Sequence, residues 1–122
     1  MATILVVEDN PANMKLAVFL LQDAGYVVLS AADAEAGLTL AREQHPDLIL
    51  MDIQLPGMDG LAAIALLKRD ETTRAIPVIA LTALAMKGDE ARIREAGCEG
   101  YIAKPTRYRE MLATVAAQLG RV

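Results

Sequence analysis

The sequence reads ILVVEDN at residues 4–10 and LILMD at residues 48–52. Each stretch opens with four apolar residues and lacks the polar–apolar alternation of a strand that has one face in water. Such runs are typical of strands buried on both faces, as in a parallel sheet covered by helices. Each stretch also ends in carboxylates: Glu8 and Asp9 in the first, Asp52 in the second. The two stretches therefore predict buried parallel strands that carry acidic groups at their carboxyl ends.

Apolar runs of this kind recur along the chain, and segments with helical signals separate them. The runs cover residues 4–7, 27–30, 48–51, 78–81 and 101–103. Helix N-terminal signals are an N-cap residue and a proline at the first helical position, and a glycine often ends a helix. These signals predict helices from Asn10-Pro11 to Gly25, from Asp33 to His45, after Asp59-Gly60, over residues 89–96 and over residues 111–119.

This alternation predicts an α/β fold of the (βα)5 type. Parallel strands joined by right-handed helical crossovers form a doubly wound three-layer sandwich. We expect a parallel five-stranded sheet in the order 2-1-3-4-5, with ligands bound at the carboxyl ends of the strands near strands 1 and 3. On the second helix, the 3–4 spacing of apolar residues predicts that Ala36, Leu40 and Ala41 face the sheet. On the third, the same spacing predicts an inward face formed by Ala62, Ala63, Leu66 and Leu67.

The composition excludes several classes of protein. The 122 residues suit one domain, and a hydrophobic fraction of 54% argues against disorder. The longest uncharged run, residues 75–86, is interrupted by Pro77 and is shorter than the roughly 20 residues of a membrane-spanning helix. A net charge of −4 and four aromatic residues argue against a surface for nucleic acid. A single cysteine, Cys98, cannot form an internal disulfide or a zinc cluster.

The first residues of the chain lack the charged segment and the long apolar stretch of a signal peptide. We therefore expect a cytoplasmic protein, with residues 1–122 forming one domain and no output domain attached.

Chemically distinctive side chains follow four of the five predicted strands. Glu8 and Asp9 follow the first, Asp52 the third, Thr82 the fourth and Lys104 the fifth. Because the carboxyl ends of parallel strands meet at one edge of a sheet, these groups should converge. Three clustered carboxylates repel one another, and a divalent cation relieves that repulsion.

Oxygen ligands with no nearby histidine or cysteine indicate Mg²⁺, which keeps several waters and takes few protein ligands. The backbone carbonyl of Gln54, two residues past Asp52, is a further candidate ligand. A carboxylate beside Mg²⁺ can accept a phosphoryl group as an acyl phosphate. Asp52 is the candidate acceptor. Lys104, the hydroxyl of Thr82 and the amide of Ala83 could then bind the phosphoryl oxygens.

Together these motifs resemble those of a response-regulator receiver domain with the CheY-like, or flavodoxin-like, fold. The resemblance is carried by residues 7–10 (VEDN), 48–60 (LILMDIQLPGMDG), 81–83 (LTA) and 101–105 (YIAKP). It extends from about residue 3 to residue 119 and is greatest to single-domain receivers. One departure concerns the metal site, because Glu8 stands where the family more often has an aspartate, which is shorter by one methylene.

The resemblance implies a role for each candidate residue. Asp52 would accept phosphate from a phosphohistidine on a sensor histidine kinase or histidine phosphotransfer protein. Mg²⁺ would be held by Glu8, Asp9, Asp52 and the carbonyl of Gln54, while Thr82, Ala83 and Lys104 would bind the phosphoryl group. Movement of Thr82 and Tyr101 would switch the surface formed by the fourth helix, fifth strand and fifth helix, where a downstream protein target docks. The resemblance implies no enzyme activity beyond self-catalysed phosphorylation and dephosphorylation, no direct nucleic-acid contact and no membrane insertion.

Three other functions were weighed against this one. A haloacid-dehalogenase-like phosphohydrolase also uses a strand-end aspartate, but it needs an acid at the position of Gln54, which cannot transfer protons. A flavin-binding protein needs a hydroxyl- and glycine-rich phosphate loop after the first strand, where this chain is acidic. A receiver that acts as a phosphate-independent scaffold would not need the five groups at the strand ends, which are Glu8, Asp9, Asp52, Thr82 and Lys104.

Overall fold

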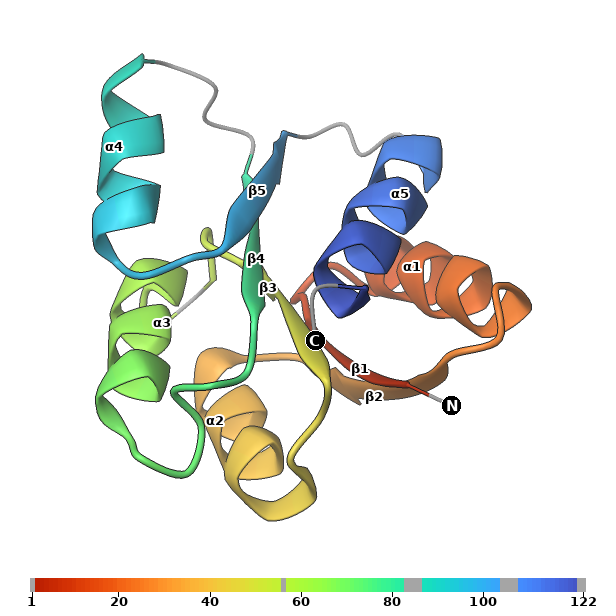
Figure 1. Cartoon of the computed structure of the whole chain (residues 1–122), viewed down its shortest axis with the longest axis horizontal. Coiled ribbons are helices and arrows are strands. Elements are labelled where there is room, and N and C mark those ends of the chain that lie inside the picture. The colour runs from red at the N-terminus through yellow and green to blue at the C-terminus, as the bar shows by residue number, and fades with distance from the viewer. Residues whose placement is uncertain (1, 56, 83–86, 104–107, 121–122) are drawn as a thin grey trace.

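Figure 1 shows a computed structural model that describes residues 2–55, 57–82, 87–103 and 108–120, with residues 87–90 described by their backbone alone. Five strands and five helices alternate along the chain and confirm the predicted (βα)5 pattern. The elements are β1 Thr3–Val7, α1 Pro11–Asp23, β2 Val27–Ala31, α2 Ala34–Gln44, β3 Leu48–Asp52, α3 Gly60–Arg69, β4 Val78–Thr82, α4 Lys87–Glu95, β5 Gly100–Ala103 and α5 Tyr108–Leu119.

The five strands form one parallel sheet in the order β2-β1-β3-β4-β5, as predicted. Helices α1 and α5 cover one face, and α2, α3 and α4 cover the other (Figure 1). Successive residues of β1 and β3 serve opposite faces: Ile4 and Leu48 pack toward α1 and α5, whereas Leu5 and Ile49 pack toward α2 and α3. All four side chains are fully buried. Burial on both faces explains why these strands show no polar–apolar alternation.

Side-chain caps begin the first three helices where the sequence predicts them. Asn10 accepts a hydrogen bond from the backbone N–H of Asn13, Asp33 from that of Ala36 and Asp59 from that of Leu61. Two boundaries differ from the prediction. Helix α4 begins at Lys87 rather than Asp89, and α5 begins at Tyr108 rather than Met111. Exposed Tyr108, Arg109 and Glu110 add a first turn to α5 that an apolar pattern could not reveal.

The predicted inward faces of α2 and α3 are partly wrong. Ala36 is exposed, and the buried residues of α2 are Ala34, Gly37, Leu38 and Ala41. In α3 the exposed residues are Ala62 and Leu66, and the buried ones are Gly60, Ala63, Ile64 and Leu67. Alanine is common on both the buried and the exposed face of a helix. An alanine-rich pattern therefore predicts that a helix forms but does not show which of its faces packs against the sheet.

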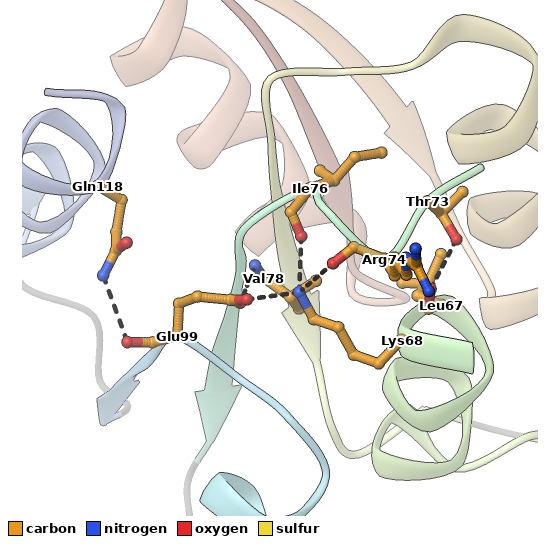
Figure 2. Close-up of polar contacts among 8 residues, drawn as sticks. All are labelled: Leu67, Lys68, Thr73, Arg74, Ile76, Val78, Glu99 and Gln118. Carbon is orange, nitrogen blue, oxygen red and sulfur yellow. Dashed lines mark hydrogen bonds and ion pairs between the residues drawn. The ribbon is translucent and has the colours of Figure 1, made fainter. Parts of the chain in front are cut away.

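A polar cluster joins the amino ends of β4 and β5 to α3 and α5 (Figure 2). Lys68 of α3 donates to the carbonyl oxygen of Ile76 at 2.8 Å and forms an ion pair with Glu99. The other carboxylate oxygen of Glu99 accepts from the backbone N–H of Val78 at 2.7 Å, and its carbonyl accepts from Gln118. The sheet is therefore cross-linked at the end opposite the carboxylates.

Cys98 lies beside this cluster, half-buried against the core on the α2–α3 side. Burial, followed by the negative charge of Glu99, raises the pKa of the Cys98 thiol to about 11. The thiol therefore stays neutral near pH 7, and Cys98 acts as a small packing residue.

The start of α3 lies against the end of β3. A Cβ placed on Gly60 would overlap the carbonyl oxygen of Asp52 and the Cα of Ile53, both of which are backbone atoms. The Gly60 N–H donates to the carbonyl of Ile53 at 3.3 Å. Glycine at position 60 thus lets the helix approach the strand end that carries Asp52.

We expect Gly60→Ala to lower the free energy of unfolding by about 1–3 kcal/mol, because backbone atoms must move to admit the methyl group. The matched control is Gly100→Ala, whose Cβ would meet nothing closer than 3.8 Å. That change should shift stability by no more than about 1 kcal/mol, in either direction. Urea unfolding of both variants tests the difference, and equal effects would contradict this account of the α3–β3 contact.

Candidate functional site

Three carboxylates lie together at the carboxyl ends of β1 and β3. Glu8 and Asp9 follow β1, and Asp52 is the last residue of β3. Because Val7 pairs with Met51 in the register of these neighbouring strands, Glu8 and Asp52 occupy equivalent positions at the sheet edge. One oxygen from each of the three carboxylates lies within 4.8 Å of the other two. The predicted convergence of Glu8, Asp9 and Asp52 is therefore observed.

Two of the three carboxylates are buried. Glu8 is 3% and Asp52 2% exposed, while Asp9 faces solvent. The Asp52 Oδ1 accepts from the backbone N–H of Gln54 at 2.8 Å, and the Glu8 Oε1 accepts from the Asn13 side-chain amide at 2.9 Å. These two neutral donors fix the orientation of the carboxylates. The site therefore combines fixed acidic ligands with one side open to water.

The donor set fits a hard divalent cation. Mg²⁺ binds oxygen at about 2.0–2.1 Å in an octahedron, so its ligand atoms lie at most about 4.2 Å apart. Oxygens that already lie within 4.8 Å need only a small side-chain adjustment to meet that geometry. The exposed position of Asp9 leaves room for the waters that Mg²⁺ usually keeps.

Thr82 lies on β4, the strand next to that of Asp52, and Tyr101 lies on β5, one strand further away. Thr82, the last residue of β4, is fully buried, and Leu81 just before it pairs with Asp52. Tyr101 of β5 pairs with Ala80 and packs, partly buried, against the core on the α2–α3 side. The two other predicted site residues, Ala83 and Lys104, lie outside the described residues.

Asn13 is a polar partner of the site that the sequence analysis missed. It is the third residue of α1, and its side chain reaches back to Glu8. The sequence did carry a sign of this contact, because Asn13 stands three residues after the N-cap Asn10. A polar side chain at this position can reach back to the segment that precedes the helix.

Comparison with known proteins supplies a second, independent line of evidence. Residues 4–116 match the family described as the response regulator receiver domain. The chain belongs to this family. The resemblance inferred from the motifs is thereby confirmed.

Relatives of this receiver domain agree with the family assignment. The chain is 52% identical to the polar-differentiation response regulator DivK of Brucella ovis over 118 residues, which covers 97% of this chain and 96% of that protein. Because the match covers 96% of that protein, the expected similarity to single-domain receivers is confirmed.

Two solved structures extend the comparison. The receiver domain of the sensor histidine kinase PA1611 from Pseudomonas aeruginosa matches with a TM-score of 0.90 and 38% identity, covering 98% of each chain, and holds a magnesium ion in its active site cleft. The chemotaxis response regulator CheY4 of Vibrio cholerae matches with a TM-score of 0.92 and 27% identity, covering 97% of this chain and 98% of that one.

This receiver domain is a phosphoacceptor of two-component signalling, with an acidic cluster that fits a Mg²⁺ site. Within the described part of the chain, no helix has the length and apolar character needed to cross a membrane.

Mutual repulsion among the carboxylates predicts that Asp9→Asn raises the thermal stability of the metal-free protein. The same change should reduce the stabilisation that Mg²⁺ provides. Asp9 forms two like-charge pairs, each of which costs about 1 kcal/mol in a water-like dielectric, so the variant should have a Tm about 8 °C higher in EDTA. With Mg²⁺ the variant should gain less stability than the wild type, because one ligand is lost. Thermal denaturation with Glu71→Gln, which removes an exposed loop carboxylate, is the control. A lower Tm of Asp9→Asn in EDTA would contradict repulsion at the site.

Proposed function

We propose that Asp52 is the residue of this receiver domain that accepts the phosphoryl group. It is the one carboxylate of the cluster that closes a central strand, and its Oδ1 is fixed by the N–H of Gln54. Its position beside Glu8 and Asp9, with one oxygen of each within 4.8 Å, is the observation that carries the proposal.

The donor is a phosphohistidine on a sensor histidine kinase or histidine phosphotransfer protein. The Asp52 Oδ2, the carboxylate oxygen that does not accept from Gln54, attacks phosphorus and forms a P–O bond. The P–N bond to the donor imidazole breaks, its electron pair stays on that nitrogen, and the nitrogen takes up a proton from solvent. The product is an acyl phosphate on Asp52.

Mg²⁺, when bound, supplies positive charge to the developing negative charge on the phosphoryl oxygens. Its ligands would be the side chains of Glu8, Asp9 and Asp52 with the backbone carbonyl of Gln54. The hydroxyl of Thr82 would donate to a phosphoryl oxygen. Ala83 and Lys104, outside the described residues, are proposed as the remaining phosphoryl contacts on the strength of the family motif.

We propose that phosphorylation is read out through protein contacts. Thr82 and Tyr101 lie at the end of β4 and on β5, so movement at the phosphorylated site would reach the surface of α4, β5 and α5. A downstream protein target would dock there. A cytoplasmic location and the lack of turnover beyond self-catalysed phosphorylation and dephosphorylation stay predictions.

Phosphorylation with a small donor tests this function. Purified protein incubated with phosphoramidate and Mg²⁺ should acquire up to one alkali-labile phosphate per chain, and Asp52→Asn or EDTA should abolish it. Continuous hydrolysis of phosphomonoesters would instead support the phosphohydrolase alternative. The lack of any label on folded wild-type protein would support the scaffold alternative and contradict the proposal.

Asp59→Asn is the matched control for loss of a nearby carboxylate. Asp59 is exposed and caps α3, and asparagine is an equally good N-cap residue. Labelling should therefore persist in this variant.

A further inference from the structure

We infer that Asn13 is a positioning residue that holds Glu8 in the orientation required for Mg²⁺ binding. This inference rests on the metal site of the proposed function. The Asn13 Nδ2 donates to the Glu8 Oε1 at 2.9 Å, although the two residues belong to different elements and Glu8 is almost fully buried. The contact thus fixes the orientation of a carboxylate that contributes one oxygen to the acidic cluster.

The helix cap fixes the position of Asn13. Its backbone N–H donates to the side chain of Asn10 at 3.0 Å, and the N–H of Met14 donates to the Asn10 carbonyl at 2.9 Å. Pro11 adds a preset φ at the first helical position. The amide of Asn13 is therefore presented from a rigid first turn rather than from a free loop.

The length of the glutamate side chain explains why such a partner is useful. A glutamate side chain is one methylene longer than an aspartate side chain and has one more rotatable bond. Fixing this more flexible side chain costs more conformational entropy. A hydrogen bond that is already formed before the metal arrives reduces that cost at binding. Outer contacts of this kind orient metal ligands and are known to affect metal affinity.

The chemistry of the amide suits this role. Asn13 is uncharged, so it orients Glu8 without reducing the negative charge that attracts the cation. A lysine or arginine at this position would compete with Mg²⁺ for the same carboxylate. A shorter hydroxyl side chain would not span the distance that the amide covers.

Isothermal titration calorimetry with MgCl₂ on the full chain tests the inference. We expect Asn13→Ala to weaken Mg²⁺ binding by about tenfold, the lower end of the range for such outer contacts. In a Glu8→Asp background the shorter carboxylate lies beyond reach of the amide, so adding Asn13→Ala should change the Mg²⁺ dissociation constant by less than about twofold. This double-mutant cycle separates positioning of Glu8 from a general effect on α1.

Gln22→Ala is the matched control, since it removes an exposed amide side chain from the other end of the same helix. It should leave Mg²⁺ affinity unchanged. An Asn13→Ala variant that binds Mg²⁺ like the wild type, or that loses affinity equally in both backgrounds, overturns the inference while the metal site stands. Wild-type protein that binds no Mg²⁺ overturns the proposed metal site itself. Asn13→Ser, whose hydroxyl is too short to make the contact, should behave like Asn13→Ala and guards against an effect peculiar to alanine.

Discussion

Mutual repulsion of three carboxylates at one sheet edge is the constraint on which the functional end of this receiver domain depends. Two of them, Glu8 and Asp52, are almost completely buried, and the register of β1 and β3 leaves them no freedom to separate. Burying like charges beside one another is unfavourable. Hydrogen bonds from neutral N–H donors and the solvent exposure of Asp9 reduce the cost of this repulsion. A bound divalent cation would reduce it further.

The two ends of the sheet differ in their polar groups. At the amino ends of β4 and β5, Lys68 and Glu99 join α3, both strands and α5 through an ion pair and backbone hydrogen bonds (Figure 2). At the carboxyl ends, acidic groups gather and no such cation is found among the described residues. The cross-linked end ties β4 and β5 to the helices beside them, whereas the opposite end would present its carboxylates to a cation and a phosphoryl group.

The sequence predicts the sheet well because doubly buried strands leave a distinctive apolar signature, and parallel order then brings Glu8, Asp9 and Asp52 together. It predicts helix rotation poorly, since Ala36 and Ala62 are acceptable on either face. Long-range polar contacts escape it altogether. The pairing of Lys68 with Glu99 joins residues 31 apart, and no local pattern marks it. Asn13 was missed because the helix-start pattern concerns Asn10 and Pro11 and does not show that the side chain at position 13 reaches back to Glu8.

The central claim is that Asp52 carries the acyl phosphate beside this acidic cluster. Borohydride reduction of the phosphorylated protein, followed by peptide mass spectrometry, tests it most directly, because reduction converts an aspartyl phosphate to homoserine. The account predicts homoserine at position 52 and unmodified aspartate at positions 9 and 59. Homoserine at position 9 or 59 with aspartate retained at position 52 would contradict it.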